Sequence, residues 1–467
     1  MKNILIGVGV FLIAIGFTAC RKTSFIDSPN ARIKASKDTV RFDTVFTTTG
    51  SVTQSFKIFN VNDQKLRLSN VRLMGGNASA FKINVDGTAG TSFDNIELEA
   101  NDSLYVFVSV IINPTAANLP FIVQDSISIN YNGNQRFVQL EAFGQNANFL
   151  RNARVTKDSS WNNNLPIVIL GSVAVDPNAT LTINKSTKVF FHADAPMLVD
   201  GTLKVVGEKF DSTRVVFAGD RLDQYYRDFP GSWPGIYFSP TSKNNVLTYA
   251  VLKNAFQGII AVLPASTGGP KVTLNECILD NIYDVGVLSV SSNIAARNCL
   301  ISNCGNNIGI GGGGTYNFVH CTVVSYGNFY LDHKKPVLFI TDANGTQINS
   351  LNATFKNCIF WGDAGAVDNE IVVDRKGTAA FSLIFENVLY RAKGNPAGTF
   401  TAPIKNEPPA FDSINTSRRY FDFHLSKGMS PAINKGNVTA IIPFDLDGKP
   451  RGGNNGIPDI GCYEKQQ

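Results

Sequence analysis

In the stretch NATFKNCIFWGD, the alternation of apolar and polar side chains changes phase in the middle. Ala353 and Phe355 alternate with polar residues, as in a strand with one buried face. Two residues later Cys358 and Phe360 alternate in the same way, but on the opposite parity. Both apolar pairs can face one interior only if the chain bends between them, and asparagine tolerates the left-handed backbone of such a bend. The pattern therefore predicts two short strands joined by a tight corner at Asn357.

The same pattern recurs through the second half of the chain. Residues equivalent to Cys358 follow one another at steps of 27, 22, 22, 37 and 30 residues: Ala250, Cys277, Cys299, Cys321, Cys358 and Val388. The residues three before and two after this position are apolar in every repeat, and asparagine precedes it in three repeats. Repeats of this length with short strands predict a solenoid. Successive coils would stack about 4.8 Å apart, so equivalent residues form ladders.

Further segments extend this solenoid in both directions. Residues 166–220 form a series of short alternating strands broken by Gly, Asn and Asp. Four motifs follow in order: SWPGIYF (232–238), SPAINKG (430–436), DLDGKPR (445–451) and PDIGCYE (458–464). With the repeats, they resemble a right-handed parallel β-helix of the pectate-lyase kind, with an asparagine ladder at its tight corner. The last three motifs resemble the choice-of-anchor type of closing motif on bacterial surface lipoproteins. The resemblance covers residues 152–464, which we expect to be one β-helix domain with this closing motif.

Residues 38–147 differ from the repeats. Predicted strands of 6–11 residues, separated by Asn, Gly and Asp turns, recur every 10–20 residues and indicate an antiparallel sandwich. This region resembles the immunoglobulin-like domains of the abnormal-spindle/hydin type. The expected fold class is therefore all-β: an N-terminal immunoglobulin-like β-sandwich followed by a right-handed parallel β-helix solenoid.

The N-terminus has the features of an export signal. Its apolar stretch, residues 4–17, would rise about 21 Å as a helix, which is too short for a hydrocarbon core of about 30 Å. The residues Phe-Thr-Ala-Cys that follow resemble the lipobox of bacterial lipoproteins. This resemblance implies a lipoprotein signal peptide over residues 1–19, acylation of Cys20, and a polar tether over residues 20–37. An ordinary secretory signal is the alternative. We expect a lipid-anchored protein of the cell envelope at the outer membrane, on its surface or periplasmic face.

Composition adds two restrictions. Charged residues make up 17% of the chain, and the net charge of +5 is scattered, so the sequence does not indicate nucleic-acid binding. Six cysteines follow Cys20, an even number that suggests disulfides in an exported protein. Ladder residues on stacked coils point in the same direction, however, so we interpret Cys277, Cys299 and Cys321 as buried free thiols. No histidine stands at ligand spacing from them, and no metal site is predicted.

The segment DRLDQYYRDFPGSW, residues 220–233, concentrates polar and aromatic side chains. Its aromatic rings could stack on sugar rings, and its charged groups could bind hydroxyls or carboxylates. The candidate glycan-binding residues are Arg221, Asp223, Tyr225, Tyr226, Arg227, Asp228 and Trp233. The alternative is a loop that covers the flank of the solenoid and buries its own aromatic rings.

Catalytic and cofactor motifs are sparse. Within the best-defined repeats no two carboxylates share a ladder position, and Asp280 and Asp284 are the pair available for glycoside chemistry. The residues DLDG begin like a Ca²⁺ loop, but Gly456 stands where such a loop ends in glutamate. We therefore expect a structural turn at Asp445 and no cofactor, with Ca²⁺ as the alternative.

These features favour a membrane-anchored, non-catalytic protein that binds a polysaccharide or an envelope protein through its β-helix. The alternatives are a polysaccharide lyase or glycoside hydrolase acting in a β-helix groove, and a purely structural envelope module. An enzyme would require at least three of the acidic and basic candidates to converge within about 6–10 Å of one another.

Overall fold

The computed structural model of the chain describes residues 24–115, 119–363, 365–426, 428–453 and 455–465. The predicted signal peptide and Cys20 lie outside these residues. Strands dominate the described part, whose helices are the 3₁₀ turns η1 (Gly76–Ala78) and η2 (Val438–Ala440). No helix in these ranges is long and apolar enough to cross a membrane. Internal contacts divide the chain into two units, with the division between Asn146 and Ala147 in the sequence.

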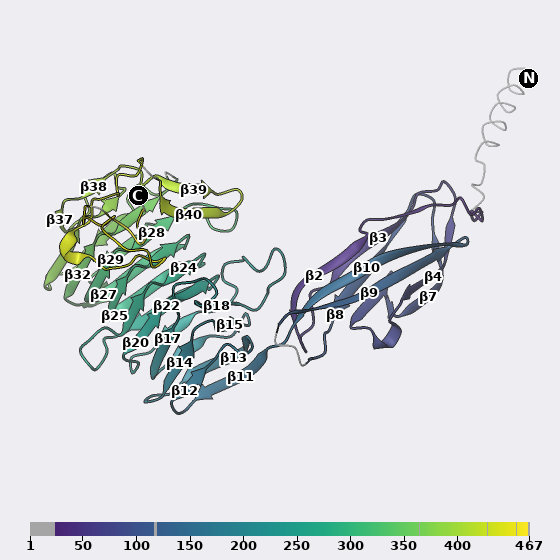
Figure 1. Cartoon of the computed structure of the whole chain (residues 1–467), viewed down its shortest axis with the longest axis horizontal. Helices are drawn as coiled ribbons and strands as arrows, with labels where there is room; N and C mark the ends of the chain where they lie inside the picture. Colours follow the sequence, from purple (N-terminus) through teal and green to yellow (C-terminus); the bar gives the residue numbers. More distant parts are fainter. Residues whose placement is uncertain (1–23, 116–118, 364, 427, 454, 466–467) are drawn as a thin grey trace, which may run out of the picture. The chain divides into compact units, whose positions relative to one another are not determined.

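The first unit is a β-sandwich of two five-stranded sheets (Figure 1). One sheet has the order β1 (Ile33–Ala35), β3 (Gln54–Asn60), β8 (Ser103–Val110), β5 (Phe81–Val85) and β6 (Thr88–Gly90). The other has the order β2 (Thr39–Phe46), β10 (Asn134–Gln145), β9 (Phe121–Tyr131), β4 (Leu66–Leu73) and β7 (Ser92–Leu98). All neighbours pair antiparallel except β2 and β10, which are parallel. Alternate residues of both sheets form one buried core.

The segment predicted as a tether is partly built into this sandwich. Strand β1 pairs antiparallel with β3, and Ile33 and Ala35 are buried in the core. Phe25 also forms a bridge with Lys65. The tether prediction is therefore wrong for the described residues from Phe25 onward. The signal was weak because β1 is only three residues long, with one polar residue between two apolar ones.

The second unit is a parallel β-helix whose strands stack in chain order from β11 to β38 (Figure 1). Each coil contributes to three faces. Face 1, before the predicted corner, contains β12 (Ser159–Trp161), β14 (Thr180–Asn184), β17 (Thr202–Val206), β20 (Asn245–Thr248), β23 (Val272–Asn275), β32 (Leu351–Lys356), β35 (Phe381–Glu386) and β37 (Thr399–Thr401). Face 2, after the corner, contains β15 (Lys188–Phe191), β18 (Val215–Gly219), β21 (Ala250–Lys253), β24 (Ile278–Asp280), β26 (Leu300–Ser302), β28 (Thr322–Ser325), β33 (Ile359–Gly362), β36 (Leu389–Tyr390) and β38 (Ile404–Lys405).

Face 3 completes each coil with β16 (Met197–Val199), β19 (Ile236–Phe238), β22 (Gln257–Val262), β29 (Leu338–Thr341) and β34 (Ile371–Asp374). Two long strands, β25 (Val285–Arg297) and β27 (Asn306–Val319), pass from face 3 into face 1. Two strands of the first coils, β11 (Asn148–Val155) and β13 (Ile167–Val175), pass from face 2 into face 3. A small hairpin, β30 (Ala343–Asn344) and β31 (Gln347–Ile348), interrupts the turn before β32.

The predicted corner is confirmed by its backbone and its core. All residues equivalent to Cys358 are completely buried in one interior cluster. Each residue before this position has a left-handed backbone: Tyr249 (φ 49), Glu276 (φ 53), Asn298 (φ 48), His320 (φ 53), Asn357 (φ 54) and Asn387 (φ 50). We call these residues the first corner. The cysteines of the described residues are free and buried, which confirms the prediction made for Cys277, Cys299 and Cys321.

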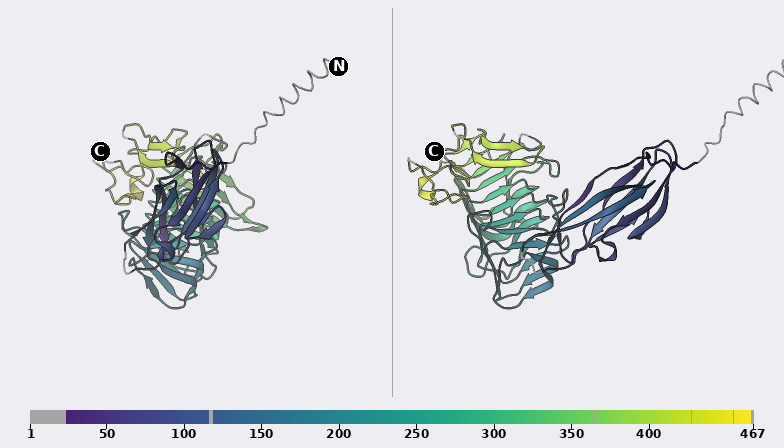
Figure 2. Two further views of the ribbon diagram at one scale, coloured as in Figure 1. Left: turned by 90° about the vertical axis from the view of Figure 1, so that its right-hand side faces the viewer. Right: turned by 45° about the vertical axis from the view of Figure 1, so that its right-hand side comes forward.

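The C-terminal segment, residues 411–465, lies against the side of the coils and does not add to the stack (Figure 2). It begins with a hairpin of β39 (Phe411–Asn415) and β40 (Tyr420–Leu425). Its apolar residues Leu446, Ile460 and Cys462 form a second core against outward-facing residues of face 2 such as Leu300 and Val324. This second core covers apolar positions of face 2 that point away from the solenoid interior.

Polar side chains of the first corner attach this segment. Asn357 accepts from the backbone N of Asn437 at 2.6 Å and donates to its carbonyl oxygen at 3.1 Å. Asn298 donates to the carbonyl of Phe444 at 2.7 Å. Arg451 of the segment donates to the Asn298 side chain at 2.9 Å and pairs with buried Glu464 at 3.2 Å. The corner therefore serves both as a bend and as a binding edge for the segment that closes the fold.

Candidate functional site

A second corner follows face 2, and three asparagines adopt left-handed backbones there: Asn254 (φ 62), Asn281 (φ 58) and Asn303 (φ 52). Asn254 donates to the carbonyl of Arg227 at 2.6 Å, and Asn281 donates to the carbonyl of Asp228 at 2.9 Å. These amides fix the β18–β19 loop, residues 220–235, to the flank of the coils. The sequence carries a signal for this corner that was not predicted: an asparagine four residues after the repeat position in three successive repeats.

Trp233 anchors the base of this loop and does not face solvent. Its side chain is fully buried and stacks on Phe191 with ring centroids 4.3 Å apart. Its indole N–H donates to the carbonyl of Lys253 at 2.9 Å. The prediction that Trp233 contacts a glycan is therefore wrong, because the ring belongs to the solenoid core.

The other aromatic residues of the loop are exposed and meet a second loop. The exposed fractions are 76% for Tyr225, 49% for Tyr226 and 49% for Phe229. In the β28–β29 loop, residues 326–337, Phe329 is 89% exposed. Tyr330 packs edge-on against Phe229, with centroids 5.3 Å apart, and its hydroxyl donates to the carbonyl of Tyr225 at 3.0 Å. We call Tyr225, Tyr226, Phe229, Phe329 and Tyr330 the aromatic cluster.

The hairpin of the C-terminal segment reaches the same place. Arg419, in the β39–β40 turn, lies over the Tyr330 ring with its guanidinium carbon 4.5 Å from the centroid. It also pairs with Asp228 at 2.8 Å. Three segments that are far apart in sequence therefore meet at the aromatic cluster. This convergence depends on the stacking register of the coils, so no local pattern could have shown it.

A buried ionic group holds the β28–β29 loop. His333 Nε2 lies 3.0 Å from Glu370 Oε1, and Arg391 donates to the same oxygen at 2.7 Å. The side chain of His333 is 1% exposed and that of Glu370 is completely buried. Asp332, the sequence neighbour of His333, pairs instead with Lys334. Glu370, the partner of His333, could not be found from the sequence because it lies on a later coil.

The charged glycan-binding candidates pair with one another or with neighbouring groups. Arg221 forms two hydrogen bonds to Asp223, at 2.7 and 2.9 Å, and its guanidinium lies 4.0 Å from the Tyr226 centroid. Arg227 and Arg419 both contact Asp228. These contacts hold Tyr226 and the loop backbone in place, and Arg227 remains 59% exposed.

The carboxylates Asp280 and Asp284 have other partners. Asp280 accepts from Ser302 and Asn303 on the next coil. Asp284 accepts from Gln257 at 2.9 Å and pairs with Lys335 at 3.4 Å. On face 3, the described outward-facing ladder beside the loops consists of Leu198, Tyr237, Ile260, Leu288, Gly309, Phe339 and Val372, none of them a carboxylate. Asp374, at the outward end of β34, is a carboxylate of the same face, and it pairs with Lys376 at 2.8 Å. The surface around the aromatic cluster therefore offers a ligand exposed aromatic rings and charged groups that are already paired.

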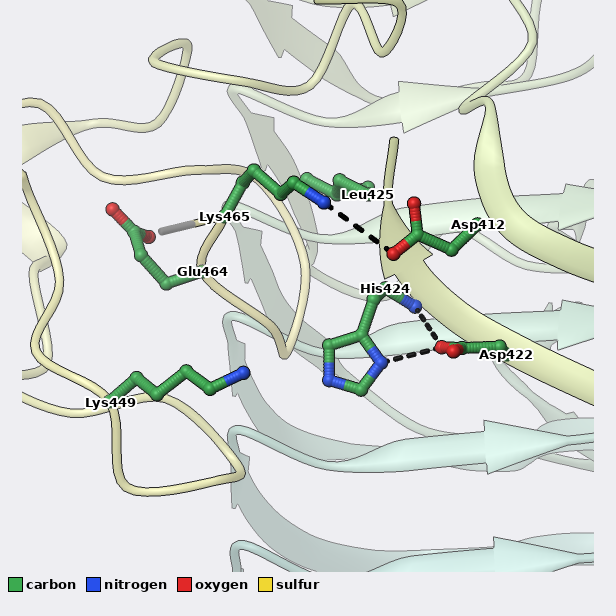
Figure 3. Close-up of a pocket in the computed structure, with 7 residues that line it drawn as sticks. All are labelled: Asp412, Asp422, His424, Leu425, Lys449, Glu464 and Lys465. Carbon is green, nitrogen blue, oxygen red and sulfur yellow. Dashed lines mark hydrogen bonds and ion pairs between the residues drawn. The ribbon is translucent and has the colours of Figure 1, made fainter. Parts of the chain in front are cut away.

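A separate cavity of about 280 Å³ lies in the C-terminal segment (Figure 3). His424 lies there between two carboxylates, with Nδ1 2.5 Å from Asp422 and Nε2 2.8 Å from Asp447. Burial lowers the pKa of His424, but its hydrogen bonds to Asp447 and Asp422 outweigh burial and raise the pKa overall. Lys465 pairs with Asp412 across the cavity. Both ring nitrogens of His424 are thus engaged, and the contact joins the hairpin to the turn at Asp445.

That turn is built by one buried carboxylate. Asp445 accepts from the backbone N–H groups of Asp447 and Lys449 through one oxygen and of Glu464 through the other. In the described part of the chain, no group of three or more His, Cys, Asp or Glu side chains is arranged to hold a metal ion. Asp445 therefore acts as a turn-forming side chain of the closing motif.

No protein family model and no curated protein matches the chain. A protein of unknown function from Porphyromonas gingivalis W83 is 15% identical, with a TM-score of 0.19, over 27% of this chain and 50% of that one. A family 123 glycoside hydrolase from Clostridium perfringens is 12% identical, with a TM-score of 0.18, over 26% of each chain. The PapD-like domain 7 of human CEP192 is 10% identical, with a TM-score of 0.17, over 26% of this chain and 87% of that one. The match thus spans half or less of the first two structures, and TM-scores of this size do not establish a shared fold.

Proposed function

We propose that the protein is a lipid-anchored lipoprotein of the cell envelope, at the outer membrane, that binds glycan through the aromatic cluster without catalysis. One observation carries the proposal: Tyr225, Tyr226, Phe229 and Phe329 expose their rings at one place on the β-helix. Aromatic rings offer a large apolar contact area at a small cost in side-chain entropy, and tyrosine adds a polar hydroxyl. Such a surface suits sugars, which combine apolar ring faces with hydroxyl edges.

The cluster is held in place before any ligand arrives. Amides of the second corner bind the loop backbone at Arg227 and Asp228, and Trp233 is packed in the core below. The Arg221 guanidinium lies over one face of Tyr226, so the position of this ring is supported by a cation–π contact. A preorganised surface loses less conformational entropy on binding, which favours affinity.

The membrane part of the proposal rests on the N-terminal sequence. The apolar stretch and the lipobox-like residues before Cys20 support acylation of that cysteine. Acyl chains contribute about 0.8 kcal/mol per buried CH₂, and two or more chains anchor a protein stably. The closing motif supports the same assignment by its resemblance to surface lipoproteins. Mass spectrometry of the membrane-extracted protein tests this part, since an unmodified Cys20 would remove the anchor.

The rival, a polysaccharide lyase or glycoside hydrolase, needs a pair of free carboxylates beside the ligand. Asp223, Asp228 and Asp284 each already bind a cation of the same surface. Asp374, the outward carboxylate of β34 on face 3, is likewise paired, with Lys376 at 2.8 Å. These contacts support binding over hydrolysis.

A glycan screen of the full chain tests the proposal, with binding and cleavage scored together. For a glycan that binds, we expect Tyr225→Ala with Tyr226→Ala to weaken affinity roughly tenfold or more, about 1.4 kcal/mol. Tyr105→Ala is a matched control: Tyr105 lies in the sandwich, is 44% exposed and has Lys57 4.4 Å from its centroid. This control should bind like the wild type.

Two results would overturn the proposal. Release of shorter saccharides that is lost in Asp228→Asn would establish the enzyme. Binding to an envelope protein that survives the double tyrosine substitution, with no glycan bound, would move the function to another surface.

A further inference from the structure

A groove of about 350 Å³ lies on face 1, on the other side of the first corner from face 2. Its floor comes from three neighbouring coils, in β23, β25 and β27. Its wall comes from residues 439–442 of the C-terminal segment. The volume falls within the range of about 300–1,000 Å³ that is typical of small-molecule sites. None of its lining residues belongs to the aromatic cluster, so this is a second site.

The floor presents polar side chains for which the described part of the chain supplies no hydrogen-bond partner. On neighbouring coils, Thr273, Ala295 and Asn317 lie in one ladder register. Two residues further along the strands, Asn275 pairs with Arg297. Among the described residues, the side chains of Thr273, Asn275 and Asn317 form no hydrogen bond. The amides point outward from face 1, since their strand neighbours fill the interior. Across two coil steps, about 10 Å, the floor therefore offers one hydroxyl and two amides.

The wall beside this floor is apolar. Ile441 is 41% exposed and lines the groove together with Ile442. The first corner holds this wall in place, because Asn357 bonds to Asn437 and Asn298 bonds to Phe444 on either side of it. A ligand in the groove would therefore meet hydrogen-bonding groups on one side and an apolar surface on the other. Saccharides have this division between hydroxyl edges and apolar ring faces.

The charge of the lining selects among saccharides. Among the described residues that line the groove, only Arg297 is charged, and its side chain is 51% exposed. Its guanidinium contacts Glu276 at 3.2 Å, and Glu276 lies in the corner with only 9% of its side chain exposed. Burial raises the pKa of Glu276, and the contact with Arg297 opposes this shift. The exposed donors of Arg297 can bind an anionic group in a bidentate manner.

We propose that this groove is a second ligand site that takes a carboxylated saccharide of one or two sugar units. The carboxylate pairs with Arg297, hydroxyls bond to Asn275, Asn317 and Thr273, and a ring face packs on Ile441. The site is independent of the proposed function, because it shares no residue with the aromatic cluster. It gives the β-helix two binding surfaces, one on either flank.

Titration calorimetry of the full chain tests the proposal, in a detergent without a sugar headgroup. The probes are cellobiouronic acid and cellobiose, which differ by one carboxylate. We expect the acid to bind at least tenfold more tightly than the neutral disaccharide, because only the acid can form charge-assisted hydrogen bonds with Arg297. Arg297→Gln should abolish this preference, and Arg297→Lys should keep part of it. Asn317→Ala, at an exposed position, should weaken both probes about fivefold.

Control variants separate this site from the aromatic cluster. Tyr225→Ala with Tyr226→Ala should leave binding of the acid unchanged, and Arg297→Gln should leave binding at the aromatic cluster unchanged. Equal affinity for the two probes, or a preference for the acid that persists in Arg297→Gln, would overturn the proposal. No binding of either probe at millimolar concentration would also overturn it.

Discussion

The two corners of the solenoid use the same local device for different purposes. Both place asparagine in a left-handed backbone, and both direct the side-chain amide at the backbone of a remote segment. The first corner binds the C-terminal segment, whose Leu446 and Ile460 bury their side chains against face 2. The second corner binds the β18–β19 loop, which leaves Tyr225 exposed. A ladder of turn-forming amides can therefore either close a core or present a surface.

The difference lies in what the bound segment brings with it. The C-terminal segment carries apolar residues and a buried ion pair, so its attachment removes surface from water. Among the aromatic residues of the β18–β19 loop, Trp233 is buried, whereas Tyr225, Tyr226 and Phe229 stay exposed. We therefore expect changes at the first corner to act on stability. Changes at the second corner should also act on binding at the aromatic cluster.

The largest effect is expected from Arg451→Met. Arg451 and Glu464 have completely or almost completely buried side chains, and Arg451 also bonds Asn298 of the first corner. Removing one partner of a buried ion pair typically costs about 3–5 kcal/mol, because the other charge is left without compensation. We expect the free energy of unfolding to fall by at least about 3 kcal/mol in chemical denaturation. Arg154→Met, which breaks a pair between the exposed Arg154 and the partly buried Asp176, should cost less than about 1 kcal/mol.

A smaller effect separates the two corners directly. Asn281→Ala removes the amide that holds the β18–β19 loop, and Asn387→Ala removes the amide that holds Lys435 of the C-terminal segment. Both replace a left-handed asparagine, so each should destabilise the protein by about 1–2 kcal/mol. Only Asn281→Ala should also weaken glycan binding at the aromatic cluster, by severalfold. Equal binding losses in both variants would show that the corners do not differ in function.

The two corners also differ in how well the sequence predicts them. The first corner could be predicted because the shift in apolar alternation recurs in six repeats that are 22 to 37 residues apart. The residues equivalent to Phe355 form one ladder, and those equivalent to Phe360 form a second ladder. Both ladders lie in the same interior cluster. The strands of the sandwich were predicted where alternation was long, as in β8 and β10. Strand β1 was missed because three residues carry too little pattern.

The site was harder to predict than the fold. The sequence marked the β18–β19 loop by composition, but composition cannot distinguish Trp233, which is packed in the core, from Tyr225, which is exposed. Phe329 and Arg419 joined the site only through the register of distant coils and the path of the C-terminal segment. The groove on face 1 was also invisible, because its wall belongs to a segment that follows the last repeat.

The smallest effect concerns a contact within the closing segment. His424 bridges the hairpin and the turn at Asp445 through Asp422 and Asp447. Its folded pKa is raised, so its contribution to stability is fully present below the unfolded value of about 6.5 and is lost as the pH rises through the folded pKa.

The pKa values of Asp422 and Asp447 are both lowered. For Asp422, burial raises the pKa, but its hydrogen bonds to His424 outweigh burial. For Asp447, the hydrogen bond to His424 is the main cause of the lower pKa. Their contribution is present above the unfolded value of about 3.9 and is lost as the pH falls through the folded pKa. The contact is therefore strongest between about pH 4 and 6.5.

We expect the free energy of unfolding to decline by roughly 1 kcal/mol as the pH rises above this window, and the decline to be absent in His424→Asn. His192→Asn, which removes an exposed contact with Asp220 outside the closing segment, should keep the decline. If the decline of the free energy of unfolding persists in His424→Asn, the closing segment depends on its apolar core and on the Arg451–Glu464 pair, and not on the contacts of His424.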